Sequence, residues 1–303
     1  MEIYNSWYLK VSQEHSIYYE CKWDKNAPPI IFLHGWPWLW FSKKDEVFFT
    51  DKNNVIFFDQ RWSGKSKYDE GNMLHDNNMD ACVSDILTLI DYLNLWNQVM
   101  LFWWSWWSTL ALVFAIRYPE KVDCLILRWI YLAGERVEED FCFGNGNEVF
   151  FPDAWEDFLS NIPERFHNDK KALSKYIWEQ ANNWNYLPLN ALLLFEYRTA
   201  KLDFSKAFSL ELSKEIHKQS LLEYYYIYNS CFIDKNYILD NANIIKHIPT
   251  HIVQGRYDNV CPPRDAYKLS KVMDKCNLQF TISWHSAYDD ATLNALKEIV
   301  SKI

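Results

Sequence analysis

Short apolar runs alternate with helical patterns along the first third of the chain, and similar runs return near its end. Strand-like runs occupy residues 16–21, 28–34, 54–59, 98–102, 122–128, 250–256 and 278–283. Residues 80–95 instead repeat apolar side chains at a helical spacing, and residues 289–303 form a second helical pattern. Because strands alternate with helices, the pattern predicts an α/β fold with a mainly parallel sheet and helices on both faces.

The character of the chain changes between about residues 135 and 243. This stretch is helical, aromatic and charged, as in DAWEDFLSNIPERF at 153–166 and LLEYYYIYNSCF at 221–232. We interpret it as an insertion into the α/β unit. The sequence therefore predicts a core made of residues 1–134 and 244–303, with a helical cap at 135–243.

One apolar segment has the length of a membrane span. Residues 99–116 carry no charge over 18 positions, which meets the length rule for a transmembrane helix. However, Ser105, Ser108 and Thr109 would make its interior polar, and a strand followed by a helix fits its flanks better. We therefore expect no membrane partner.

Charge and cysteine usage limit the partners and the location. The chain has 31 Lys and Arg against 40 Asp and Glu, and this net charge of −9 would repel a nucleic-acid backbone. The seven cysteines lie far apart without a CxxC pair, as is typical of reduced thiols in a cytosolic protein. No HExxH motif or His and Cys cluster occurs, so we expect a cytoplasmic protein without a metal or an organic cofactor.

Ser105 stands at the junction of a strand-like run and an apolar helical run. A nucleophile elbow places its serine at such a junction, above the sheet. The elbow requires small residues two positions before and after the serine, whereas Trp103 and Trp107 occupy them here. A serine at a strand end also often only caps the next helix, so Ser105 alone is a weak candidate.

Two later residues strengthen the interpretation. In an α/β-hydrolase the nucleophile, acid and base follow one another along the chain. Asp258 follows the strand-like run at 250–256, and His285 follows the run at 278–283. Either could be a turn or surface residue, but the three together predict a catalytic triad. The loop after His34 has the place of an oxyanion loop, so we expect the backbone N–H groups of Trp36 and Trp106 to form the oxyanion hole.

The motifs together resemble those of the proline iminopeptidases, α/β-hydrolases with a helical cap. That family has HGGPGxG, DQRGxGxS, GGSWGSTLAL, LRGI, GRYDxVCP and GHSA. This chain has HGWPWLW, DQRWSGKS, WWSWWSTLAL, LRWI, GRYDNVCP and WHSA. The resemblance implies release of N-terminal proline from small peptides through an acyl-enzyme on Ser105. It also implies that Glu196 and Glu223 of the cap bind the substrate's ammonium group, although each could be an ordinary solvated carboxylate.

Two other functions stay open. The fold and the triad do not fix the substrate, so an esterase or an amino-acid amidase is one alternative. The other alternative is a catalytically inactive binding protein, in which tryptophan side chains fill the pocket.

Glycine and tryptophan have unusual counts. The chain has 7 Gly and 16 Trp, whereas about 20 Gly are expected at the usual ~7%. Tryptophan stands at nine family glycines: Trp36, Trp38, Trp40, Trp62, Trp103, Trp104, Trp107, Trp129 and Trp284. Trp106 and Trp155 match family tryptophans. We hypothesise that the gene uses UGA for glycine and that its UGA codons have been read as tryptophan. Trp7, Trp23, Trp96, Trp178 and Trp184 cannot be assigned from the sequence.

Overall fold

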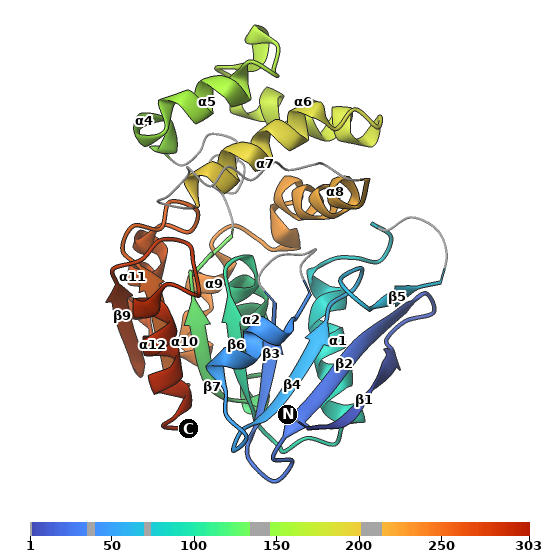
Figure 1. Ribbon diagram of the computed structural model, residues 1–303, viewed down its shortest axis with the longest axis vertical. Coiled ribbons are helices and arrows are strands. Elements are labelled where there is room, and N and C mark those ends of the chain that lie inside the picture. The colour runs from blue at the N-terminus through green and yellow to red at the C-terminus, as the bar shows by residue number, and fades with distance from the viewer. Residues whose placement is uncertain (1, 35–39, 70–73, 134–145, 201–213) are drawn as a thin grey trace.

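One twisted sheet forms the centre of the computed structural model, which describes all residues except 1, 35–39, 70–73, 134–145 and 201–213 (Figure 1). The strands are β1 (Ile3–Lys10), β2 (His15–Trp23), β3 (Pro29–Leu33), β4 (Asn54–Asp59), β5 (Lys67–Tyr68), β6 (Val99–Trp104), β7 (Val122–Arg128), β8 (Thr250–Gly255) and β9 (Cys276–Thr281). Their order is β1-β2-β4-β3-β6-β7-β8-β9, and β5 pairs with β2. From β4 to β9 neighbouring strands are parallel, whereas β2 runs antiparallel to β1 and β4. The predicted, mainly parallel sheet is confirmed.

Fifteen helical segments are described in the chain outside the gaps given above. They are η1 (Lys43–Phe48), α1 (Met79–Tyr92), α2 (Trp106–Arg117), η2 (Pro119–Lys121), α4 (Asn147–Phe150), α5 (Pro152–Leu159), η4 (Glu164–Phe166), α6 (Lys170–Asn182), α7 (Leu187–Thr199), α8 (Lys214–Tyr228), η5 (Ser230–Phe232), α9 (Tyr237–Asp240), α10 (Ala242–Ile245), α11 (Pro263–Val272) and α12 (Asp290–Val300).

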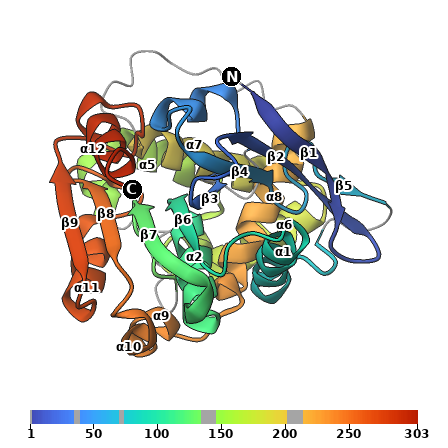
Figure 2. The ribbon, with the colours of Figure 1, turned by 90° about the horizontal axis from the view of Figure 1, so that it is seen from below.

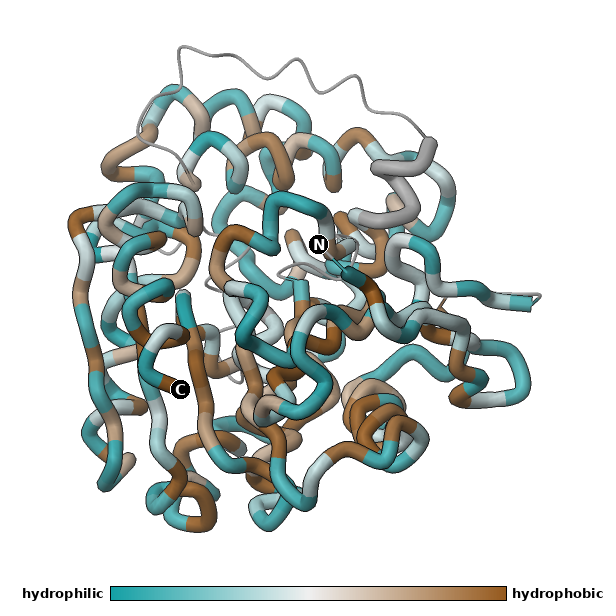
Figure 3. The backbone as a smooth tube through the Cα atoms, turned by 60° about the horizontal axis from the view of Figure 1, so that its bottom comes forward, coloured by the Kyte–Doolittle hydropathy of each residue, from teal (hydrophilic) through white to brown (hydrophobic). Residues whose placement is uncertain are grey.

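The central strands are buried on both faces because successive side chains point to opposite sides. Ile31 and Leu33 of β3 belong to the core on the side of α1 and α2, whereas Ile30 and Phe32 pack with η1 and α12. Figure 2 shows α12 on one side of the row of strands and α1 and α2 on the other. In Figure 3 the hydrophobic stretches run along these central strands. The continuous apolar runs in the sequence therefore follow from two covered faces.

The helices α4 to α8 lie above the sheet, over the end at which β6 and β7 finish (Figure 1). The helix α8 is held to the core by Tyr226, whose hydroxyl donates to Asn77 Oδ1 at 2.7 Å and lies 3.2 Å from Cys82 Sγ of α1. The helix α9, which lies before the predicted end of the cap at residue 243, packs instead against α2. The core and cap boundaries stay a prediction.

The apolar segment 99–116 forms strand β6 and most of helix α2. Within the described residues, no helix is both long and apolar enough to cross a membrane.

Candidate active site

Ser105 lies in the sharp turn between β6 and α2. Its backbone is left-handed, with φ 57° and ψ −143°, a conformation that is strained for a residue with a side chain. The serine N–H donates to the carbonyl oxygen of Arg128 at 3.0 Å, and the N–H of Ser108 donates to the serine carbonyl at 2.8 Å. These bonds tie the turn to β7 and to the first turn of α2. The strained strand-to-helix turn is typical of a nucleophile elbow.

The three residues of the predicted triad meet above the sheet. Ser105 Oγ lies 3.1 Å from His285 Nε2, and His285 Nδ1 lies 2.9 Å from Asp258 Oδ2. The His285 side chain is 5% exposed and that of Asp258 is fully buried. An imidazole between a hydroxyl and a buried carboxylate can take the hydroxyl proton and be stabilised as imidazolium. The geometry is therefore that of an activated serine nucleophile.

Gln254 of β8 supports the Asp258 carboxylate, and no motif in the sequence points to this residue. Its Nε2 donates to Asp258 Oδ2 at 3.3 Å and to the Cys261 carbonyl at 2.8 Å, while its Oε1 accepts the Ile130 N–H at 3.1 Å. The other carboxylate oxygen accepts the N–H groups of Val260 and Cys261 at 2.9 and 2.8 Å. The buried amide thus links the loops after β7 and β8 to the carboxylate.

Cys261 lies beside the nucleophile, although the sequence indicated only a reduced thiol there. Its Sγ is 3.9 Å from Ser105 Oγ. Burial, and next the charge of Asp258, raise the pKa of the thiol well above its usual value. The thiol is therefore neutral at pH 7, and it lines the site as a small, weakly polar side chain.

The two expected oxyanion donors are described unequally. Trp106 is the first residue of α2, so its backbone N–H belongs to the unpaired first turn of a helix, directly after Ser105. Trp36 lies outside the described residues. The oxyanion hole therefore stays a prediction.

Glu196 and Glu223 come together in the helices above the sheet. Glu196 lies on α7 and Glu223 on α8, and both are buried. Among the described residues, neither carboxylate oxygen of Glu196 has a hydrogen-bond partner. Burial, and then the charge of Glu223, raise the pKa of Glu196 well above its usual value. The charge of Glu196 in turn raises the pKa of the Cys261 thiol, whose Sγ lies beside Ser105 Oγ.

Comparison with known proteins agrees with this geometry. The family described as "alpha/beta hydrolase fold" matches residues 28–283. Proline iminopeptidase of Arabidopsis thaliana is 33% identical over 300 residues, covering 95% of this chain and 76% of the plant protein. Proline iminopeptidase of Neisseria meningitidis serogroup B is 30% identical over 315 residues, covering 99% and 96% of the two chains. The chain belongs to the proline iminopeptidase family of α/β-hydrolases.

A solved structure supports the fold of this family member. An esterase from Exiguobacterium antarcticum superposes with a TM-score of 0.60 at 18% identity, and the match covers 97% of this chain and 98% of the esterase. At this identity the likeness shows the fold alone. The α/β-hydrolase fold predicted from the sequence is confirmed.

Several tryptophans at family glycines surround the triad. The Trp129 indole stacks on the His285 imidazole with ring centres 4.0 Å apart. Trp103 is fully buried under the elbow, and among the described residues its indole N–H has no acceptor. The buried Arg128 guanidinium lies 3.5 Å from the ring centre of Trp104 and 4.4 Å from that of Trp129. Large side chains thus lie at positions near the triad where the family motifs have glycine.

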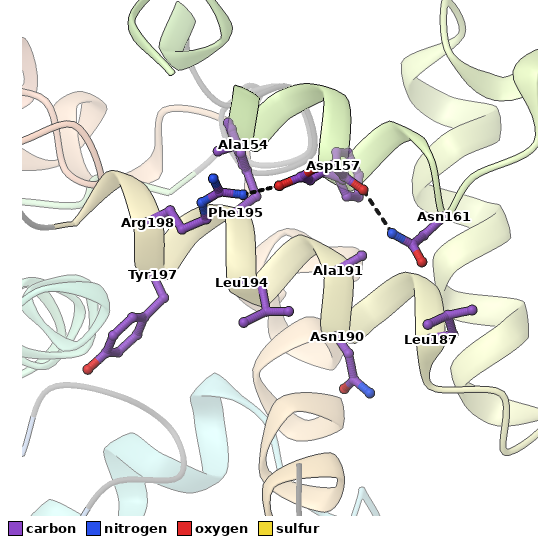
Figure 4. Close-up of a pocket in the computed structure, with 11 residues that line it drawn as sticks. Ala154, Asp157, Asn161, Leu187, Asn190, Ala191, Leu194, Phe195, Tyr197 and Arg198 are labelled. Atoms are coloured by element: carbon purple, nitrogen blue, oxygen red, sulfur yellow. Dashed lines mark hydrogen bonds and ion pairs between the residues drawn. The ribbon is translucent and has the colours of Figure 1, made fainter. Parts of the chain in front are cut away.

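A separate pocket of about 280 Å³ lies between α5 and α7 (Figure 4). Its lining includes Arg198, which pairs with Asp157 and, at 2.7 Å, with Asp153, so the two helices are joined by ion pairs. Leu194 and Arg198 of α7 line this pocket, but Glu196 does not. Glu196 is therefore not part of this pocket.

Proposed function

We propose that this protein is a serine aminopeptidase that releases N-terminal proline from small peptides. The observation that carries the proposal is the buried, unpaired carboxylate of Glu196 among the described residues, next to Glu223 and near the triad. A buried carboxylate without a hydrogen-bond partner is costly, so a site that places the Glu196 carboxylate beside a second buried glutamate is suited to a cation. The relatives named above are proline iminopeptidases, whose name states the same specificity.

The prolyl ammonium group would bind between Glu196 and Glu223. Its positive charge favours the ionised form of Glu196, because an opposite charge within about 4–6 Å stabilises a carboxylate. Two N–H groups on the ring nitrogen match two acceptors, and these charge-assisted bonds are the stronger kind. An N-blocked proline has neither the charge nor the donors, so this site would select a free N-terminus.

The cleavage step follows from the three triad residues. Ser105 Oγ attacks the prolyl carbonyl carbon, and His285 Nε2 takes the hydroxyl proton while Asp258 holds the imidazole through Nδ1. The oxyanion is stabilised by backbone N–H groups, for which we propose those of Trp36 and Trp106. His285 then protonates the leaving amine, and water hydrolyses the prolyl ester on Ser105 by the reverse proton path. No cofactor enters the step.

The activity is tested with the protein isolated from its own source. Values of kcat/KM are measured for a proline amide, an alanine amide, an N-acetylproline amide and a simple acetyl ester. We expect the proline amide to be the best substrate by far. An acetyl ester or the blocked amide as the best substrate would instead support an esterase or a general amidase and contradict the proposal.

Variants test the role of the acidic pair. Glu196→Gln and Glu223→Gln should weaken cleavage of the proline amide and leave the acetyl ester almost unaffected. Glu179→Gln is the matched control, because Glu179 is exposed on α6 and forms a surface ion pair with Lys175. A cytoplasmic location is also part of the proposal, supported by the free thiols of the described cysteines.

A further inference from the structure

Tryptophan is frequent where the backbone is left-handed. Among the described residues, twelve non-glycine residues have φ between 48° and 72°, and four of them are tryptophans: Trp23, Trp62, Trp129 and Trp184. This region is uncommon for any residue with a Cβ, and a bulky side chain there is an outlier. Asn and Asp, which tolerate it better, account for three of the other eight. The backbone at the four tryptophans is thus one that favours glycine.

The family motifs allow a check, at two of these tryptophans, of whether a left-handed backbone marks a position at which the family has glycine. Trp62 (φ 63°) and Trp129 (φ 53°) stand at glycines of the family motifs DQRGxGxS and LRGI. By contrast, Trp106 and Trp155, which match family tryptophans, lie in α2 and α5. Left-handed backbone thus occurs at two of the family's glycines and at neither of its two tryptophans, whereas Trp107, at another family glycine, lies in α2.

Trp184 occupies the position after α6 that a glycine usually takes. The helix ends at Asn182 with Asn183 as its C-cap, and Trp184 follows with φ 63°. The Trp184 N–H donates to the Ala181 carbonyl at 3.1 Å, and the Asn185 N–H donates to the Gln180 carbonyl at 2.9 Å. These two bonds define a Schellman motif, whose left-handed residue is most often glycine. The Trp184 side chain is 78% exposed, so core packing does not explain the indole.

Trp23, the last residue of β2, also has a positive φ, 72°. Its N–H still pairs with the Glu2 carbonyl at 3.1 Å, and the next N–H, of Asp24, pairs with the Asn53 carbonyl at 3.1 Å. The turn is therefore fixed by backbone bonds. Within the described chain the indole N–H of Trp23 is buried without an acceptor, so the side chain adds an unsatisfied donor to a strained turn.

Trp178 differs from Trp23 in its backbone, which is helical, although Trp23 also has ring contacts, with Phe49 and Phe57 at 6.0 Å each. Trp178 lies inside α6, and its ring stacks on Tyr225 and Tyr228 of α8 at 5.8 and 5.1 Å, with interplanar angles of 25° and 11°. A glycine there would remove both ring contacts and would weaken the helix interior.

We infer that the protein made in its own cell carries glycine at positions 23 and 184 and tryptophan at position 178. The inference extends the UGA hypothesis to positions that the sequence could not assign, and it predicts UGA at the first two codons and UGG at the third. None of the three positions belongs to the proposed catalytic site. Failure of this assignment would therefore leave the aminopeptidase proposal standing, and the reverse also holds.

Tandem mass spectrometry of the protein isolated from its own source tests the inference. Trypsin releases residues 176–198 as one peptide, since no Lys or Arg lies between Lys175 and Arg198. We expect glycine at 184 and tryptophan at 178 in this same peptide, so each position is a control for the other. Tryptophan at 184, or glycine at 178, would overturn the assignment. Cleavage after Glu20 and Glu46 releases residues 21–46, in which tryptophan at 23 would equally contradict it.

Discussion

The Trp129 indole lies on the face of the His285 imidazole, with ring centres 4.0 Å apart and planes inclined by 29°. This contact covers the proposed catalytic base with a side chain from a left-handed position next to Arg128. A base that is covered on one face has less room for the substrate and for the small movements that accompany proton transfer. The presence or absence of the Trp129 side chain therefore decides how much space is free beside the His285 imidazole.

The first prediction concerns this contact. We define the nine-glycine protein as the chain with Trp→Gly exchanges at the nine family glycines. A second protein carries eight of the exchanges and keeps Trp129. Its kcat/KM for a proline amide should be roughly 10- to 100-fold lower than that of the nine-glycine protein, because overpacking costs typically 1–3 kcal/mol. Keeping Trp40 instead is the control, since its side chain is 51% exposed. Equal activities of all three proteins would contradict the crowding that we describe.

Gln254 provides a second prediction as a positioning residue. In Gln254→Met, Asp258 loses one hydrogen-bond donor, so its carboxylate is held less firmly against His285 Nδ1. We expect kcat to fall by about 10- to 100-fold, the loss of a bond to a charged group worth about 1.5–3 kcal/mol, while KM changes little. Gln279→Met, on exposed β9, is the matched control. A lower stability with an unchanged kcat would mean that Gln254 only packs.

Glu196 provides the third prediction, on activity. Glu196→Gln keeps the shape of the side chain but removes the charge that the prolyl ammonium needs. A charge-assisted bond is worth about 1.5–3 kcal/mol, so kcat/KM for a proline amide should fall about 10- to 150-fold. An unchanged value would remove Glu196 from substrate binding.

The fourth prediction concerns the stability of the same variant. Because burial raises the pKa of Glu196, the folded protein holds this proton more tightly than the unfolded chain does. The stability that this group provides is present below a pH of about 4.5 and is lost as the pH rises through the folded pKa. At pH 7, Glu196→Gln should therefore increase the free energy of unfolding by about 1–3 kcal/mol, and the gain should vanish near pH 4. Urea unfolding at the two pH values measures this difference, and a loss of stability at pH 7 would contradict it.

The sequence predicted the α/β fold and the three residues that the structure brings within hydrogen-bond distance. Ser105, Asp258 and His285 each follow a strand-like run, and parallel strands deliver such residues to one edge of the sheet. Gln254 could not be predicted, because it lies within an apolar run where only the tertiary arrangement shows which groups its amide reaches. The burial of Glu196 was equally hidden, since it depends on how α7 and α8 pack.

The nucleophile and the amine site can be tested together by competition labelling. The protein isolated from its own source is treated with a fluorophosphonate, and the labelled residue and the rate of labelling are determined. The account predicts labelling of Ser105 that is slowed by prolinamide but not by N-acetylprolinamide, because only the free amine can bind between Glu196 and Glu223. Absence of label on Ser105, or equal protection by the two amides, would contradict the central claim.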